Sequence, residues 1–333
     1  MSLIKQKTIN DSMKKSSILL LLISSFMSFG QANDDAYNEA LDNFKIHFNE
    51  RQFDSIHEMF AESMKKAVTL DVLKIQMESF YQMAGLIKDV SFLKDSEGSK
   101  IFRVNHEKNL WEYRIALKAN NKIIGLRPQP YISPDIKIIE RNITKMILPF
   151  KEEWYVFWGG TEVAKNYHVA HENQKYAYDI MMVKDGSSLK GDPKKNESYY
   201  VFGKDVIAPC DAKVVQVIKG VHDNIPGEMN PGQLTGNTVV LETDSKEYIL
   251  FAHLKQGTIV VNEGQMVKQG DLLGNCGNSG NTTEPHLHLS LQNTKDMFSA
   301  TGGKLFFDKI NVNGKIKEDY LPEQGDKIKN IEN

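Results

Sequence analysis

The segment from Glu284 to Leu291 constrains the fold more than any other part of the chain, because polar residues alternate there with leucines. Such an alternation is typical of a β-strand that turns one face toward the protein core. His286, His288 and Ser290 are expected on one face, and the leucines on the other. Two neighbouring imidazoles are unfavourable on a buried face unless they have polar partners. The segment therefore predicts a chemical site as well as a strand.

Residues elsewhere in the chain are suitable partners for these histidines. His253 follows the apolar run that begins at Tyr248, and Asp179 interrupts an aromatic and aliphatic run. A buried carboxylate needs a cation or a metal ion beside it. Histidine and aspartate together form a nitrogen and oxygen donor set suited to Zn²⁺, and three protein ligands leave a fourth position for water. This arrangement is typical of catalytic zinc sites.

The length of 333 residues suggests two domains, and the two halves differ in pattern. The first half predicts helices followed by strands, which indicates an α+β domain. From about residue 168 onward, short β-rich runs alternate with Gly and Asn turns, which favours an all-β sandwich or a small barrel. The helices are expected around 37–48, 53–60 and 69–84, the last ended by Gly85, and the strands over 90–93, 101–104, 110–117 and 122–126.

The first thirty residues have the pattern of a secretory signal peptide. Lys14 and Lys15 precede an apolar run from Ile18 to Phe29, and small residues follow. We therefore expect the mature protein to be exported, to a periplasmic or extracellular location. No run of about 18 apolar residues predicts a membrane span.

Composition and missing motifs narrow the classes of function. The formal net charge of −2 provides no electrostatic footprint for nucleic acid. Cys210 and Cys276 are too few for a disulfide-stapled scaffold, and whether they pair is open. No His-Glu-x-x-His helix, Gly-x-Ser-x-Gly elbow or P-loop occurs.

Residues of about 149–310 resemble the lysostaphin-type (LytM-like) zinc metallopeptidases, which cleave peptide bonds in bacterial peptidoglycan. The resemblance rests on a His…Asp pair, on His253-Leu254, and on His286-Leu287-His288 near the end. It also rests on the strand-and-turn segment 203–214 and on the glycine-spaced stretch 260–281. The resemblance implies a secreted zinc endopeptidase that hydrolyses cross-links or stem peptides through a zinc-activated water assisted by two histidines.

The same resemblance assigns the site residues. It implies one zinc ion per chain, with His168, Asp179 and His288 as ligands, while His253 and His286 assist catalysis. The first ligand is the open assignment, because His171 lies nearer to Asp179 in the sequence than His168 does. Which of the two assisting histidines acts as base and which as donor is also open. The loops Asp185–Ser198 and Asp223–Gly236 are expected to border the substrate groove, with His222 at the start of the second.

The pattern of the first half resembles a small NTF2-like (cystatin-like) domain. The expected organisation is a signal peptide (1–30), an NTF2-like α+β domain with helices on a curved antiparallel sheet (33–127), a proline-rich linker (128–148), a mainly β, barrel-sandwich-like peptidase domain with an antiparallel sheet groove (149–312) and a C-terminal tail (313–333). Covering the groove, binding a protein partner and docking substrate are all open roles for this N-terminal domain, and the sequence does not distinguish them.

Three alternatives accompany this interpretation. A catalytically silent LytM-like scaffold that regulates another cell-wall hydrolase has the same fold, but such members typically lack metal ligands. A biotinyl- or lipoyl-like carrier suits the glycine turns but leaves the histidines unexplained. Cys276 as a nucleophile lies in a turn of the motif without a base beside it in the sequence.

Overall fold

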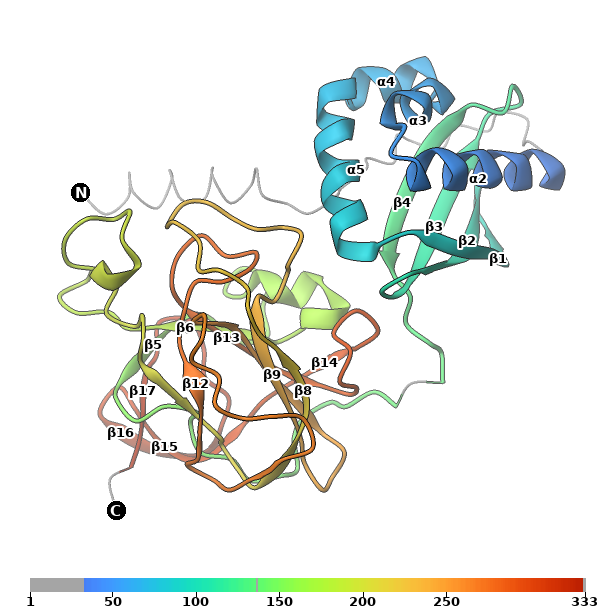
Figure 1. Cartoon of the computed structure of the whole chain (residues 1–333). Helices are drawn as coiled ribbons and strands as arrows, with labels where there is room; N and C mark the ends of the chain where they lie inside the picture. Colours follow the sequence, from blue (N-terminus) through green and yellow to red (C-terminus); the bar gives the residue numbers. More distant parts are fainter. Residues whose placement is uncertain (1–32, 136, 332–333) are drawn as a thin grey trace. The chain divides into compact units, whose positions relative to one another are not determined.

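The computed structural model describes residues 33–135 and 137–331, which form two compact units (Figure 1). The first unit ends at Tyr131 and the second begins at Ile132. The expected signal peptide lies outside the described residues, so export stays a prediction. None of the helices in the described ranges is both long and apolar enough to cross a membrane.

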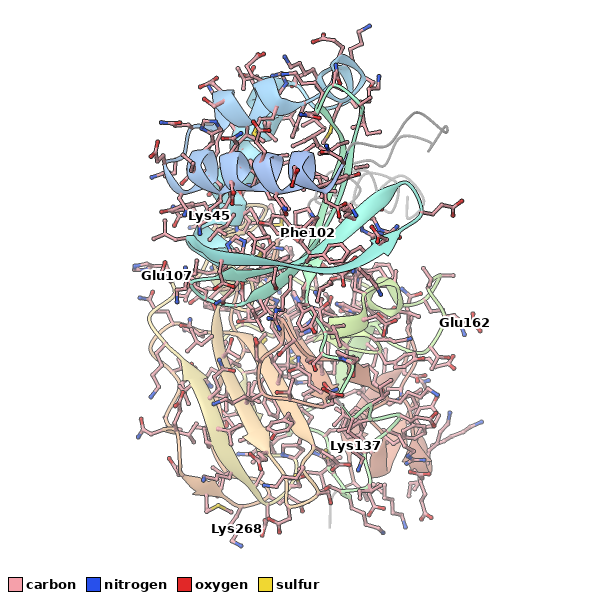
Figure 2. All side chains as sticks on the ribbon, turned by 90° about the vertical axis from the view of Figure 1, so that its right-hand side faces the viewer. Lys45, Phe102, Glu107, Lys137, Glu162 and Lys268 are labelled. Atoms are coloured by element: carbon pink, nitrogen blue, oxygen red, sulfur yellow. The ribbon has the colours of Figure 1, made fainter. Side chains whose placement is uncertain are left out.

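Over its described residues, the first unit consists of four helices and a four-stranded antiparallel sheet in the order β1-β2-β3-β4. In α2 most apolar side chains, such as Leu41 and Phe44, are buried, and the Asn33 side chain caps the helix by accepting a hydrogen bond from the Ala36 amide. Tyr37 packs on Phe102 of β2 with ring centroids 6.4 Å apart, so α2 covers one face of the sheet (Figure 2). The elements are α2 (Asp34–Asn49), α3 (Phe53–Met59), α4 (Glu62–Ala67), α5 (Leu70–Ala84), β1 (Ile87–Ser96), β2 (Ser99–His106), β3 (Leu110–Leu117) and β4 (Ile123–Pro130).

The α+β class expected for this half is confirmed, and Gly85 ends α5 with a φ of 76°. The short helix α4 was not expected from the sequence, because six residues are too few for a helical periodicity to be recognised. The likeness to an NTF2-like domain stays a prediction.

The second unit is mainly β, as expected, and is built on one large antiparallel sheet. Its order is β11-β8-β9-β10-β13-β6-β5-β17-β15-β16, with β14 beside β13, and β12 pairs separately with β7. The leucines of β13 lie in the core, as their alternation predicts. The strands are β5 (Trp154–Trp158), β6 (Tyr178–Met181), β7 (Asp205–Ile207), β8 (Ala212–Ile218), β9 (Asn237–Glu242), β10 (Tyr248–Leu254), β11 (Met266–Val267), β12 (Leu272–Asn275), β13 (Leu287–Gln292), β14 (Gly302–Gly303), β15 (Phe307–Val312), β16 (Lys315–Tyr320) and β17 (Lys327–Asn330). Short 3₁₀ helices are η1 (Tyr167–Ala170), η2 (Glu172–Gln174) and η3 (Asn196–Ser198).

The segment 313–333 is not a tail over its described part. β16 and β17 pair with β15, and β17 also pairs with β5. Ile328 is fully buried, and the Asn330 side chain donates to the carbonyls of Leu148 and Phe150. The sequence of this segment looks polar because Ile328 is the one buried side chain of β17, and the other residues of that strand are two lysines and an asparagine.

The linker is shorter than the expected 128–148. β4 extends to Pro130, while Met146 and Leu148 already belong to the core of the second unit. Asn142 holds the segment before Met146 against the second unit, because its side chain donates to the Phe306 carbonyl and accepts from the Phe306 amide. The prolines in the sequence predict a connection between the two units, but they do not show at which residue the packed core of the second unit begins.

Candidate metal centre

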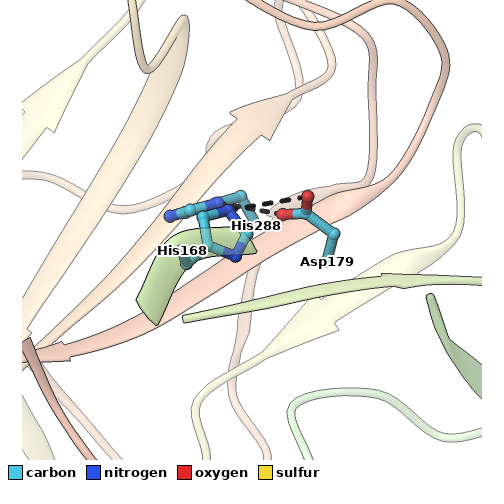
Figure 3. A group of neighbouring side chains, drawn as sticks. All are labelled: His168, Asp179 and His288. Atoms are coloured by element: carbon cyan, nitrogen blue, oxygen red, sulfur yellow. Dashed lines mark hydrogen bonds and ion pairs between the residues drawn. The ribbon is translucent and has the colours of Figure 1, made fainter. Parts of the chain in front are cut away.

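His288 and Asp179 lie directly opposite each other on neighbouring strands of the large sheet. β13 pairs antiparallel with β6, and the register places these two residues across from one another. The His288 Nδ1 atom is 3.0 Å from the Asp179 Oδ1 atom (Figure 3). The strand alternation that buries the leucines therefore also directs His288 toward the carboxylate.

His168 reaches the same carboxylate from η1. Its Nε2 atom is 3.7 Å from the Asp179 Oδ2 atom, and Figure 3 shows both imidazoles beside this one side chain. One donor atom from each of the three residues lies within 4.8 Å of the others. Ligand atoms around a tetrahedral zinc ion with bonds of about 2.0–2.1 Å are about 3.3 Å apart, so the spacing is close to that of a zinc site.

Asn166 determines which nitrogen of His168 faces Asp179. The Asn166 Nδ2 atom donates to the carbonyls of Gly160 and Ala177, so its Oδ1 atom is the acceptor for His168 Nδ1 at 2.8 Å. With the proton on Nδ1, the Nε2 atom carries a lone pair. This Nε2 atom is buried without a hydrogen-bond partner in the described protein, and it faces a carboxylate oxygen. Two facing electron-rich atoms need a cation between them, so the three side chains fit a metal ion.

The surroundings favour the protonation states that metal ligands require. Burial lowers the pKa of His168 to about 3, which keeps its imidazole neutral at physiological pH. Burial alone raises the pKa of Asp179, but its interactions with the neighbouring His168 and His286 and hydrogen bonds from His286 and His288 hold that pKa well below its usual value. A neutral imidazole beside an ionised carboxylate is the state that binds a divalent cation.

His253 lies at an irregularity of β10 beside this group. The pairing of β10 with β9 shifts between Phe251 and Leu254, and His253 there adopts a left-handed φ of 61°. Its Nδ1 atom is 2.8 Å from the Ser279 carbonyl oxygen, to which it donates, so Nε2 is left without this proton. Burial, with the nearby His286 and His288, lowers the pKa of His253 well below its usual value. Strained backbone at such a position is common where a side chain must be aimed at a site.

The imidazole of His286, one residue before β13, is also oriented by a hydrogen bond to a main-chain carbonyl. Its Nδ1 atom donates to the Glu284 carbonyl at 2.9 Å, and the Thr282 hydroxyl lies 3.2 Å from the same nitrogen. The His286 Nε2 atom is 3.4 Å from Asp179 Oδ1. Burial by itself lowers the pKa of His286, but the attraction and hydrogen bond of Asp179 outweigh it and raise the pKa. The ring centroids of His286 and His253 are 4.9 Å apart.

The structure thus brings together all five residues expected at the site: His168, Asp179, His253, His286 and His288. His171 and His222 are exposed, and His171 is not part of the three-residue group. Cys210 and Cys276 are buried and unpaired, and burial raises the pKa of both thiols, of Cys210 to about 12. A thiol with a raised pKa is a poor nucleophile, so the geometry does not favour Cys276 in that role.

Sequence reasoning missed the residues that orient the histidines. Asn166 stands two positions before His168, and this spacing was a usable signal. Ser279 and Thr282 lie in a turn rich in Gly, Asn and Thr, where single residues show no distinguishing pattern. The two loops expected near the site do meet this turn, because Asn224 donates to the carbonyls of Gly280 and Thr282, and Asn278 donates to Asn196.

The buried group of His168, Asp179 and His288, with two more histidines beside it, is of the kind that could hold one metal ion. Residues 199–300 match the family model described as peptidase family M23, which agrees with the lysostaphin-type resemblance of this part of the chain. The match includes His253, His286 and His288. Residues 42–126 match the model of a family described as a protein of unknown function, DUF3887.

Several solved structures are similar to parts of this chain. The catalytic domain of lysostaphin from Staphylococcus simulans is 20% identical, with 46% of this chain and 88% of that chain covered and a TM-score of 0.27. A putative glycyl-glycine endopeptidase lytM from Ruminococcus gnavus is 24% identical, with 38% and 42% covered and a TM-score of 0.25. A chain of the SpoIIQ-SpoIIIAH pore-forming complex is 19% identical, with 48% and 89% covered and a TM-score of 0.31. With TM-scores this low, nothing about activity rests on these similarities. No curated protein matches the sequence significantly.

Proposed function

We propose that this protein is an exported, zinc-dependent endopeptidase that hydrolyses peptide bonds in peptidoglycan cross-links or stem peptides. One observation carries the proposal. The unprotonated Nε2 atom of His168 faces the Asp179 carboxylate, and no hydrogen-bond donor of the described chain lies on that nitrogen. A cation satisfies both groups at once, whereas an apolar core or a hydrogen-bonded network does not explain the pair.

His168 through Nε2, Asp179 through a carboxylate oxygen and His288 through a ring nitrogen are the proposed ligands of one zinc ion per chain. The donor set of two imidazoles and one carboxylate suits zinc and leaves a position for substrate or water. A zinc ion held there supplies Lewis-acid activation of water and of a peptide carbonyl.

His253 and His286 are the proposed catalytic pair. Each donates its Nδ1 proton to a main-chain carbonyl, of Ser279 and Glu284 respectively, so the proton that each exchanges is the one on Nε2, which in His286 lies 3.4 Å from Asp179 Oδ1. Hydrolysis of an amide needs one group to receive the proton of the attacking water and one to protonate the leaving amine. Two adjacent imidazoles with the same fixed tautomer meet both needs.

The proposed substrate class rests on the family match, and the proposed location rests on the signal-peptide pattern of the first thirty residues. Membership of residues 199–300 in peptidase family M23 supports a peptide-bond hydrolase. The sequence pattern of residues 1–30 supports export, which would bring the enzyme to the cell wall. A silent scaffold is disfavoured because the chain retains every expected ligand and both assisting histidines.

Zinc content tests the proposal directly. Elemental mass spectrometry on the full mature chain, dialysed against zinc and then against buffer, is expected to give about one zinc per chain for the wild type. His168→Ala and His288→Ala are expected to lose it, while the exposed His171→Ala is the matched control and keeps it. Absence of zinc from the wild type would overturn the metal site.

Digestion of purified sacculi, with released fragments identified by mass spectrometry, tests the substrate. Cleavage by the wild type but not by His253→Ala or His286→Ala is the expected result. A zinc-loaded wild type that releases no fragment from any sacculus tested would instead identify the protein as a silent scaffold.

A further inference from the structure

The sheet of the first unit carries a row of cations on the face turned away from α2. Phe102 of β2 packs against α2, so its neighbour Ile101 is directed to the opposite face of the sheet. The register places Lys94 of β1 on one side of Ile101. On the other side it places Arg114 of β3 and, beyond Arg114, Arg127 of β4. These residues form one line across the four strands, so their side chains share this outer face.

Arg103 adds a further cation to the outer face. It is two positions after Ile101 in β2, and residues with this spacing lie on the same side of a strand. Its side chain is exposed, as are those of Lys94 and Arg127, whereas Arg114 is half-buried. We refer to Lys94, Arg103, Arg114 and Arg127 together as the cationic face.

The carboxylates on the outer face do not neutralise these cations. Glu112 is directly opposite Arg103 in the register, but its carboxylate accepts a hydrogen bond from the Gln129 side chain at 2.8 Å. Asp89 accepts a hydrogen bond from the Asn105 side chain at 2.9 Å. The ion pairs within the described part of the first unit include no member of the cationic face. The positive charges are therefore available to an anion from outside the unit.

The pair of Arg114 and Arg127 is unfavourable for the sheet by itself. The two residues are directly opposite each other on neighbouring strands, where Cβ atoms are about 5 Å apart and like charges are destabilising. Arg114 donates a hydrogen bond of 2.6 Å to the hydroxyl of Ser96, which is a neutral partner. An anion bound by both guanidinium groups removes this repulsion, and a guanidinium binds a carboxylate through two parallel hydrogen bonds.

We propose that the cationic face docks the protein onto its polymeric substrate by binding free carboxylates of peptidoglycan stem peptides. The inference rests on the proposed peptidase function and adds a second contact with the polymer, made by the first unit. A stem peptide that is not cross-linked ends in a carboxylate, so the polymer presents this anion repeatedly. Phosphate-bearing polymers offer similar chemistry, but carboxylates are the anions that the proposed substrate itself carries. Binding through a second unit raises the effective concentration of the peptidase unit at the polymer.

Sedimentation with purified sacculi at physiological salt tests the docking. The full mature chain carries His253→Ala as the parent substitution, so that the polymer stays intact during the measurement. Sacculi stripped of phosphate-bearing polymers are used untreated or with their carboxylates amidated, which removes the negative charge and keeps the peptide bonds. Amidation is expected to weaken binding of the parent about tenfold, because several exposed ion pairs of modest strength are lost together.

The double variant Arg114→Gln/Arg127→Gln identifies the residues that read the carboxylates. It is expected to bind untreated sacculi about tenfold more weakly than the parent does, and to bind amidated sacculi nearly as well as untreated ones. Arg51→Gln is the matched control, because Arg51 is an exposed arginine of the same unit that already pairs with Glu78, and it is expected to keep the parental ratio. Circular dichroism checks that each variant is folded.

Equal binding of the parent to untreated and amidated sacculi would overturn the docking, as would an unchanged ratio in the double variant. A preparation that keeps its phosphate-bearing polymers is measured alongside. Binding to that preparation alone would also overturn the proposal, in favour of phosphate as the anion. None of these measurements needs turnover. A protein that binds through the cationic face but digests no sacculus would support this inference while contradicting the proposed function.

Discussion

The side-chain oxygen of Asn166 accepts a hydrogen bond of 2.8 Å from Nδ1 of His168, and a second one from the His168 amide. Its side-chain nitrogen donates to the carbonyls of Gly160 and Ala177. All four hydrogen bonds that an asparagine side chain can make are therefore formed, so neither this amide nor the imidazole has an alternative orientation. Asn166 thus determines that the lone pair of His168 is on its Nε2 atom, which faces the proposed metal site.

Asn166→Ala is expected to weaken zinc binding about 10–100-fold, because His168 then loses the partner that fixes its tautomer and ring orientation. Competition with a chromophoric chelator measures the affinity. The control is Asn142→Ala, which removes another buried asparagine, one that donates to the carbonyls of Thr144 and Phe306, and is expected to leave zinc affinity unchanged. Equal affinities of wild type and Asn166→Ala would contradict this role.

Gly236→Ala is expected to reduce peptidase activity at least tenfold while the protein keeps its zinc. A Cβ atom at Gly236 would lie 2.2 Å from the Ser279 carbonyl oxygen, which is the acceptor for His253. Displacing that oxygen misorients the imidazole without touching a metal ligand. Gly257→Ala is the matched control, since its φ of 75° imposes a similar backbone strain but no atom lies within 4 Å of the added carbon. A Gly236→Ala enzyme as active as the control would refute the proposed positioning of His253.

The strand carrying His286 and His288 could be predicted because its leucines and histidines alternate with the period of a strand. Asp179 was equally visible, as a carboxylate within an apolar run. The resemblance favours His168 over His171, but residue spacing alone does not decide between them, since both precede Asp179 and the path of η1 and η2 brings one of them back. Hydrogen bonds to main-chain carbonyls, such as that of His253, depend on turns whose residues carry no individual signal.

The division into two units could be predicted from the change of sequence pattern along the chain. The strand at the C-terminal end of the second unit could not be predicted in this way. The β17 strand contributes one fully buried side chain, Ile328, between lysines. A strand held by one apolar residue and by Asn330 hydrogen bonds has no run long enough for an alternation to be recognised.

Ile328→Ala is expected to destabilise the second unit by about 2–5 kcal/mol, through lost apolar burial and a cavity against β5 and β15. Urea unfolding measures the change. Ile316→Ala, on the exposed side of β16, is the control and is expected to change stability by no more than about 0.5 kcal/mol. A similar small effect at Ile328 would show that the C-terminal strand is dispensable, as a tail would be.

His106 is expected to make the first unit less stable in acid. Its ring is buried, with Nδ1 2.8 Å from the Gly85 carbonyl oxygen and Nε2 2.8 Å from the Tyr113 hydroxyl. Burial lowers the pKa of His106 to about 4, below the usual 6.5, so between these values the unfolded chain binds more protons than the folded one. The neutral ring's contribution is present in full above pH 6.5 and is lost as the pH falls toward 4.

The expected loss between pH 7.5 and pH 5 is about 2 kcal/mol. Hydrogen exchange of β2 and β3 amides in increasing urea measures the stability of this unit separately from the second. His106→Gln has no proton to bind in this range, so its stability is expected to change less with pH by that amount, even if the variant is less stable overall. The same pH dependence in both proteins would mean that other groups cause the acid sensitivity, because only the wild type can gain a proton at this buried position.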